Sequence, residues 1–151
     1  MPLRTNTPMP SLIGATEWIN GMPGEEELQN APVLIHFWST GCHICHENMP
    51  TVLRWKQEFM PKGLKVVAFH MPRSEAELDV DEVKRQVEEM HITEPCGIDN
   101  AHQEADAFDN RFVPAYFLFD RDGKLRSRTA GDAGLSNMEA TLRRMFDTTA
   151  A

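Results

Sequence analysis

A strongly apolar run that ends at a pair of cysteines limits the folds open to this chain more than any other feature. The run is Val33–Trp38, its only polar member is His36, and Cys42-His43-Ile44-Cys45 follows directly after it. Such a run predicts a strand covered on both faces, as in a mostly parallel sheet. Apolar residues then recur at helical spacing, which predicts a helix from about residue 43 to 60.

A second apolar run, Leu64–His70, follows this helix. The order strand, helix, strand favours a right-handed parallel crossover. Three further amphipathic helices are predicted, because each of three later segments carries an apolar stripe opposite a charged face. The stripes are Val80, Val83, Val87 and Met90, then Ala101, Ala105, Phe108 and Phe112, and finally Leu135, Met138, Leu142 and Met145.

Three shorter segments complete the expected sheet. Pro95–Ile98 begins with a proline, which suits an edge strand. Residues 116–120 and 124–129 flank a tight-turn sequence and predict two antiparallel strands. Residues 1–30 mix Pro, Gly and Asn with short apolar patches, so we expect an irregular extension there with a small edge hairpin.

Length and composition favour one domain over residues 1–151. The chain has 151 residues, 41% of them hydrophobic, and a formal net charge of -8. The negative charge opposes nucleic acid as a partner, since phosphate binding needs clustered Lys and Arg. No apolar run has the length of a membrane span. Residues 1–10 lack the apolar core of a signal peptide, so the printed chain is expected in the cytoplasm, although a trimmed exported form would have the same sequence.

The two cysteines of the motif lie where disulfide chemistry is favoured. Cys42 is expected near the N-terminus of the helix, where unpaired N–H groups and the helix dipole stabilise the nucleophilic thiolate. Cys45, one turn on, can reach back to resolve a mixed disulfide. His43, when protonated, adds favourable charge beside the thiolate. Cys96 lies outside the motif and is expected to be a buried, non-catalytic residue.

The run from His36 to Cys45, with Pro50 and the later Val113-Pro114-Ala115, resembles the thioredoxin superfamily. The order of elements resembles the TlpA/ResA branch, in which a helix and strand are inserted, here over residues 79–98. His70–Glu75 and Val113–Asp120 are similar to YkuV-type proteins of that branch. The resemblance covers about residues 8–147 and implies a thioredoxin-like three-layer α/β/α sandwich with a mixed sheet.

The resemblance also implies supporting residues. In the family the proline that matches Pro114 is cis and faces the cysteines, where the backbone before it pairs with a substrate strand. Many thioredoxins have a buried Asp at the position of His36 and a Trp at that of Gly41. His36 can therefore be a proton relay to Cys45 or a hydrogen-bonded core histidine.

The sequence also leads to an expectation for Trp38 and for Glu75. Trp38 is expected in the core, at the apolar rim of the motif. ResA-like proteins keep a carboxylate near the dithiol after the second strand. Glu75 is the candidate for it and is not placed in the catalytic set.

Three other classes of protein fit parts of the motif. Cys42-His43-Ile44-Cys45-His46 matches the attachment signature of c-type haem. A zinc-binding module can use both cysteines with scattered histidines, although no second paired-ligand motif is present. A peroxiredoxin-like peroxidase fits Ser39, three residues before Cys42, but Ile35 stands where its motif has a proline.

The favoured function is that of a thiol-disulfide oxidoreductase that reduces or exchanges protein disulfides through Cys42 and Cys45. No organic cofactor and no metal are expected. In a reducing cytoplasm, the net direction is reduction of substrate proteins, with a thioredoxin-reductase-like partner as electron donor.

Overall fold

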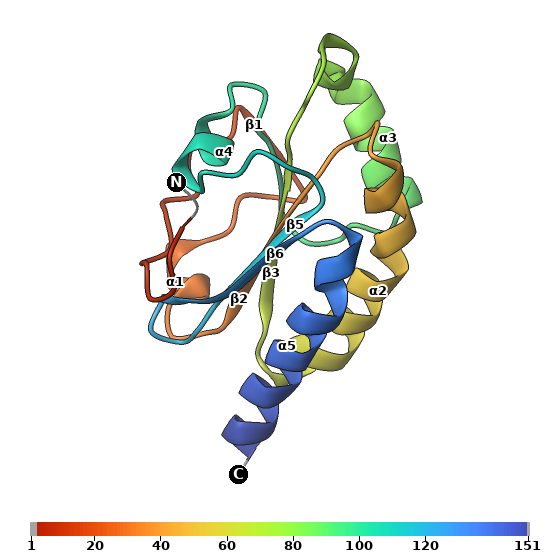
Figure 1. Cartoon of the computed structure of the whole chain (residues 1–151). Coiled ribbons are helices and arrows are strands. Elements are labelled where there is room, and N and C mark those ends of the chain that lie inside the picture. Colours follow the sequence, from red (N-terminus) through yellow and green to blue (C-terminus); the bar gives the residue numbers. More distant parts are fainter. Residues whose placement is uncertain (1–2, 151) are drawn as a thin grey trace.

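A six-stranded sheet lies between two layers of helices in the computed structural model, which describes residues 3–150 except the side chains of residues 132 and 148–150 (Figure 1). The strand order is β1-β4-β3-β2-β5-β6. The strands are β1 (Glu17–Ile19), β2 (Val33–Trp38), β3 (Lys65–His70), β4 (Cys96–Ile98), β5 (Ala115–Phe119) and β6 (Leu125–Ala130). The α-helices are α1 (Glu25–Leu28), α2 (His43–Phe59), α3 (Val80–Glu89), α4 (Gln103–Ala107) and α5 (Leu135–Ala150).

The sheet is mixed, as the sequence predicted. Strand β3 pairs in parallel with β2 and β4, whereas β1, β5 and β6 each join their neighbour antiparallel. Strand β2 is central and buried along its whole length, which agrees with its nearly continuous apolar sequence. The cysteine motif follows β2 at the end of the sheet where α2 begins.

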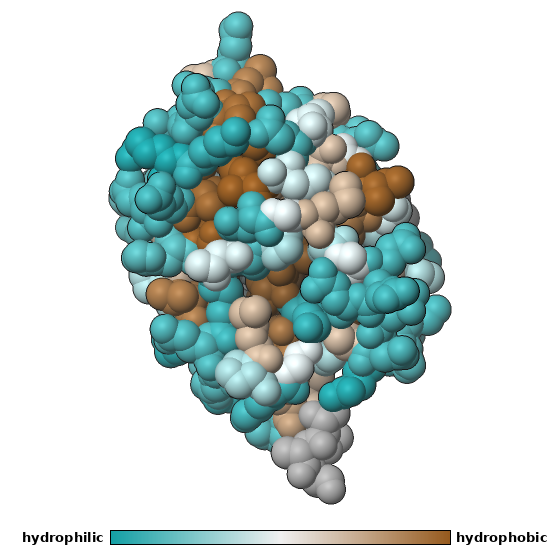
Figure 2. Space-filling model, turned by 180° about the vertical axis from the view of Figure 1, so that it is seen from behind, coloured by the Kyte–Doolittle hydropathy of each residue, from teal (hydrophilic) through white to brown (hydrophobic). Residues whose placement is uncertain are grey.

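The two faces of the sheet bury separate apolar clusters because side chains alternate along a strand. Leu34 and Trp38 face the layer of α2, α3 and α5, and the cluster there includes Cys42 and Cys45. Val33, Ile35 and Phe37 face the layer that contains α4 and the N-terminal segment. Hydrophilic side chains cover most of the surface seen from behind, with apolar ones gathered in a hollow near its middle (Figure 2).

The edge of the sheet differs from the prediction. Strand β4 is not an edge strand, because β1 pairs with it from outside. Gly97 makes this approach feasible: a Cβ there would lie 2.7 Å from the Phe69 ring and 2.9 Å from Ala15. Within residues 3–30 the structure has one strand, β1, which pairs with β4 and not with a hairpin partner; the chain then turns through Asn20 and Gly21, both at positive φ, and leads to α1.

The helix predicted from the stripe between Ala101 and Phe112 is longer than the helix that the structure has there. Helix α4 ends at Ala107, and Asp109 adopts a left-handed conformation that leads the chain toward Pro114. Phe112 is consequently 68% exposed. The helix and strand expected over residues 79–98 are present as α3 and β4. Among residues 3–150, no helix is long and apolar enough to cross a membrane.

Candidate active site

Cys42 and Cys45 lie at the N-terminus of α2 and are joined by a disulfide. Cys42 is the N-cap residue, and the two Cα atoms are 5.2 Å apart. The Cys45 N–H donates to the Cys42 sulfur over 3.1 Å. This donor belongs to the first turn, whose N–H groups have no partner within the helix. Together with the helix dipole it favours a thiolate at Cys42 once the disulfide is reduced.

The disulfide is nearly closed to solvent, and the two residues between the cysteines are not. Cys42 is 5% exposed and Cys45 only 1%. The His43 side chain is 86% exposed, with Nε2 2.9 Å from a carboxylate oxygen of Glu47. Ile44 is also exposed. A disulfide of another protein that approaches from outside therefore meets Cys42 before Cys45.

Pro114 lies at the same end of the sheet as the motif. The Val113–Pro114 peptide bond is cis, the isomer that the family resemblance implies. The next residue, Ala115, pairs with Phe37 near the end of β2. Val113 packs against the apolar clusters of both faces.

His70, at the end of β3, holds the segment between β2 and Cys42. Its Nε2 accepts the Thr40 N–H over 3.1 Å. Burial, more than any other influence, lowers the pKa of His70 to about 4. At neutral pH the ring is therefore uncharged and can accept this hydrogen bond. The Trp38 ring packs edge-on against it at 5.0 Å between centroids.

A buried carboxylate contacts the same segment. Glu77, in the 3-10 helix η2 (Glu75–Leu78), accepts a hydrogen bond from the Ser39 hydroxyl. The Arg73 N–H donates to the same oxygen over 2.8 Å, and the Arg73 guanidinium lies 3.2 Å from the other. The residue that sequence reasoning considered, Glu75, is exposed. The carboxylate next to the motif is thus two residues further on.

His36 belongs to a buried charged network beneath α2. Its Nε2 is 2.6 Å from one oxygen of Glu94, and the ammonium group of Lys56 is 2.6 Å from the other. Burial opposes the charge of Glu94, but His36 and Lys56 more than offset it and hold the pKa of that carboxyl well below its ordinary value. These contacts are those of a hydrogen-bonded core histidine, and the proton relay to Cys45 stays a prediction.

The other residues singled out in the sequence lie as follows. Trp38 is buried in the core at 1% exposure, and Cys96 is fully buried. Burial raises the pKa of the Cys96 thiol to about 12, which keeps it protonated and unreactive. In the described residues, no group of three or more His, Cys, Asp or Glu side chains is placed to hold a metal ion.

Sequence reasoning missed five side chains that surround the motif or its helix. They are Lys56, His70, Arg73, Glu77 and Glu94. Lys56 offered a signal: it follows Val52 by four residues and precedes Phe59 by three, which places it on the buried stripe of α2. The others offered none, because their partners are distant in the sequence or lie in an irregular segment.

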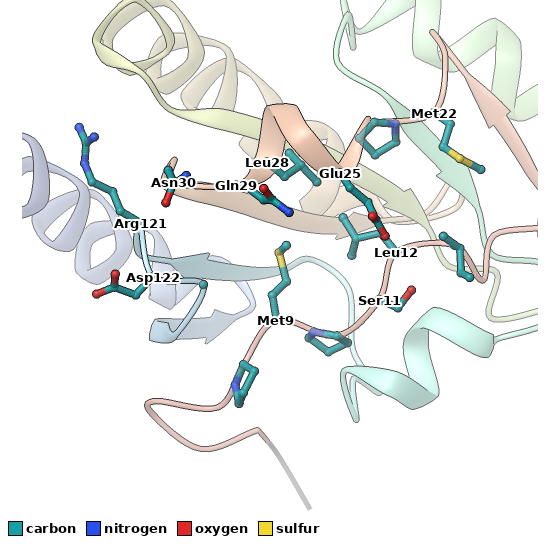
Figure 3. A pocket seen from close by; sticks show the side chains of 15 residues that line it. Met9, Ser11, Leu12, Met22, Glu25, Leu28, Gln29, Asn30, Arg121 and Asp122 are labelled. Carbon is teal, nitrogen blue, oxygen red and sulfur yellow. The ribbon is translucent and has the colours of Figure 1, made fainter.

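A separate cavity of about 740 Å³ lies at the other end of β2. The N-terminal segment, α1 and the β5–β6 turn line it, and in Figure 3 Met9 extends from the N-terminal segment toward α1. Asn30, which precedes β2, belongs to this lining, whereas Cys42 follows β2. The cavity is therefore not part of the disulfide site.

A disulfide that caps the helix after a central strand, beside a cis proline in a mixed sheet, defines a thiol-disulfide oxidoreductase of thioredoxin-like fold. The chain belongs to the Redoxin family, whose model matches residues 23–142.

Individual relatives agree with this family. The chain is 42% identical over 145 residues to thiol-disulfide oxidoreductase YkuV of Bacillus subtilis (strain 168), a match that spans 95% of this chain and 97% of that protein. It is 26% identical to thiol-disulfide oxidoreductase ResA of Bacillus anthracis over 80% of this chain and 66% of ResA. A solution structure of a thioredoxin-like protein in the oxidised form superposes with a TM-score of 0.87 at 41% identity, over 97% of this chain and 99% of that one.

Proposed function

We propose that this protein reduces disulfides of other proteins, with Cys42 as the nucleophile and Cys45 as the resolving thiol. One observation carries the assignment: the Cys42 sulfur caps α2 and accepts the Cys45 N–H, so the helix stabilises negative charge on that sulfur. The greater exposure of Cys42 supports it as well, since Cys45 is more deeply buried.

The reaction follows from this asymmetry. The Cys42 thiolate attacks one sulfur of the substrate disulfide, a mixed disulfide forms, and the first substrate thiolate leaves. Cys45 then loses its proton, and its thiolate attacks the Cys42 sulfur and expels the second substrate thiolate. The substrate gains two electrons and becomes a dithiol, while the protein returns to the Cys42–Cys45 disulfide.

Catalytic turnover requires an external dithiol to reduce this disulfide again. We place the protein in a reducing cytoplasm with a thioredoxin-reductase-like donor, where the net direction is reduction. Within this proposal Pro114 presents backbone to the substrate and His43 tunes the thiol pKa. His36, which contacts Glu94, is either a core histidine or the group that relays the Cys45 proton.

Single cysteine variants test the two roles. Cys45→Ser should accumulate a mixed disulfide between Cys42 and substrate protein, because the intramolecular attack that releases it is lost. Cys42→Ser should lose both trapping and turnover. Non-reducing gel electrophoresis with mass spectrometry of the linked peptides measures both, and Cys96→Ser is the matched control that should behave as the wild type. Trapping of equal strength by Cys42→Ser would reverse the assignment.

A further inference from the structure

Positive charge gathers on β6 and on the segment before Pro114, although the chain as a whole is acidic. The formal net charge is -8, yet residues 110–131 contain two Asp and five basic residues, which are Arg111, Arg121, Lys124, Arg126 and Arg128. Strand β6 is the last strand of the sheet. This side of the molecule therefore attracts anions, whereas the net charge of the rest of the chain repels them.

A small cavity of about 180 Å³ lies within this basic region, between the end of β6 and the segment that precedes the cis proline. The buried rings of Phe108 and Phe117 are part of its lining, and so is Phe112, which is 68% exposed. Arg111 and Arg128 line it as well. The volume is below the range of pockets that hold a whole small molecule, which begins at about 300 Å³. A single side chain of a polypeptide is the occupant that fits.

The two guanidinium groups at this cavity have donors to spare. The Arg111 side chain is 78% exposed and lies 3.7 Å from a carboxylate oxygen of Asp109. Arg128 is exposed, and its Nε donates to the Leu3 carbonyl over 3.1 Å. Within the described part of the chain, the two Nη atoms of Arg128 have no acceptor. Asp109 also lines the cavity, so two guanidinium groups face one carboxylate, and a second carboxylate would find paired N–H donors there.

The cavity borders the place where a substrate is expected. Ala130, which lines it, pairs with Ala115, and the Gly131 N–H donates to the Pro114 carbonyl over 2.9 Å. Arg111 precedes Pro114 by three residues, and three residues of extended chain span at most about 10 Å. A polypeptide whose backbone meets the segment before Pro114 can therefore place a nearby side chain in the cavity.

We propose that Arg111, Phe112 and Arg128 form a subsite that selects substrate proteins with a glutamate within about three residues of their disulfide. The aromatic lining contacts the methylene stem of the glutamate, and the guanidinium groups bind its carboxylate. Aspartate has a stem shorter by one methylene and fits less well. The subsite rests on the proposed function, because the disulfide that it selects is the one that Cys42 attacks. It acts on the choice of substrate, while the two cysteines carry out the reaction.

Symmetrical disulfide dimers of short synthetic peptides test the subsite. Each peptide has one cysteine and carries Glu, Gln or Lys at one of the three positions on either side of it. Two electrons pass from the Cys42–Cys45 dithiol to the peptide disulfide, which gives two peptide thiols and the protein disulfide. Stopped-flow tryptophan fluorescence of the reduced protein gives the rate constant. At one or two positions only, the Glu peptide should react about 3- to 10-fold faster than the Gln peptide.

Variants are compared by the ratio of the Glu and Gln rate constants, because both peptides meet the same thiolate and the ratio cancels any change in its reactivity. Arg111→Gln, Arg128→Gln and Phe112→Ala should each lower this ratio, and the double arginine variant should abolish the preference. Arg111→Glu should instead favour the Lys peptide. Salt at about 0.5 M should weaken the preference of the wild type. Arg144→Gln is the matched control, since Arg144 is exposed on α5 and does not line the cavity.

The same measurements contain the results that would overturn the subsite. An equal advantage of Glu at every position would show attraction by the basic region as a whole. A ratio that the double arginine variant leaves unchanged would exclude both guanidinium groups. Self-association that Arg111→Glu abolishes, without any peptide preference, would assign this face to a second copy of the chain. If the protein reduces all peptides without regard to charge, only the subsite fails; if it leaves every peptide disulfide intact, the proposed function itself fails.

Discussion

Lys56→Met should lower the free energy of unfolding by about 3–5 kcal/mol, because it leaves the ionised Glu94 buried with one charged partner removed. Lys56 is 6% exposed and Glu94 4%, and their charged atoms are 2.6 Å apart. Methionine fills nearly the same volume as the lysine stem, so the loss measures charge rather than packing. Urea unfolding of the oxidised protein, followed by tryptophan fluorescence, gives the value.

Two further variants distinguish the effect of the unpaired buried charge from a nonspecific loss of stability. Lys84→Met breaks an exposed ion pair with Glu17, whose charged atoms are 3.0 Å apart, and should cost less than about 1 kcal/mol. Adding Glu94→Gln to Lys56→Met removes the uncompensated charge while an amide oxygen remains for His36. We expect this addition to recover at least about 1 kcal/mol. Equal losses of stability for Lys56→Met and Lys84→Met would show that the buried charge of Glu94 does not depend on Lys56.

The network also explains how α2 is held on the sheet. Lys56 donates to the His91 carbonyl over 3.1 Å in addition to Glu94. The Asn20 amide donates to the carbonyls of Ile92 and Glu94 at 2.7 and 3.0 Å. One buried ammonium therefore ties the cysteine-bearing helix to the segment before β4, and through Glu94 and His36 to β2. Because Lys56 lies in the last turn of α2, this connection helps to hold in place the helix whose N-terminus carries the disulfide.

The centre of the fold and the disulfide pair were predictable because the signals that specify them are local. Val33–Trp38 is a continuous apolar run, and Cys42 follows it at the point where helical periodicity begins. Position at a helix N-terminus is itself a local property, so the N-cap role of Cys42 followed without knowledge of the tertiary contacts. The buried central strand and the helix His43–Phe59 confirm this part of the prediction.

The edge of the sheet and the surroundings of the motif depend on contacts between residues far apart in the sequence. Glu94 meets Lys56 across 38 residues and His36 across 58, and no periodicity of a single element encodes such a pair. The choice between Glu75 and Glu77 depends on the turn of a short 3-10 helix, which side chain spacing alone does not determine. The position of β1 outside β4 likewise depends on the close approach that Gly97 permits.

Gly41 shows that a departure from a family pattern can be informative before its cause is visible. Many thioredoxins have a Trp where this chain has Gly41, and the structure places the Glu77 carboxylate in the space that a side chain would need. The absence of a side chain at position 41 leaves room for that carboxylate, whose position the sequence alone does not predict.

Glu104→Gln should stabilise the protein at pH 8 by about 1–3 kcal/mol and have little effect below pH 4.5. Glu104 is 2% exposed. One of its oxygens accepts the Gly14 N–H over 3.0 Å, and the other is buried without a hydrogen-bond partner among the described residues. Burial, with the Asp99 carboxylate nearby, raises the pKa of Glu104 from 4.5 to about 7 despite the bond from Gly14.

The sign of the effect follows from proton linkage. The folded protein holds the Glu104 proton more tightly than the unfolded chain does, so the contribution to stability is most favourable below pH 4.5. It falls as the pH rises from 4.5 to about 7, because over this range the unfolded chain can release the proton while burial near Asp99 keeps the carboxyl protonated in the folded protein. Glutamine keeps an oxygen for Gly14 and never acquires the charge. Its advantage therefore grows above pH 4.5, where ionisation favours the unfolded wild-type chain.

Urea unfolding at pH 4.5, 6 and 8 tests this expectation, with Asp106→Asn as the matched control. Asp106 lies on the same short helix and is exposed, so removing its charge should leave the pH dependence of the wild type unchanged. The difference between Glu104→Gln and the wild type should grow steadily from the lowest pH to the highest. An equal loss of stability at all three pH values would mean that Glu104 contributes a hydrogen bond that glutamine cannot replace, and that its charge is not what limits the fold at alkaline pH.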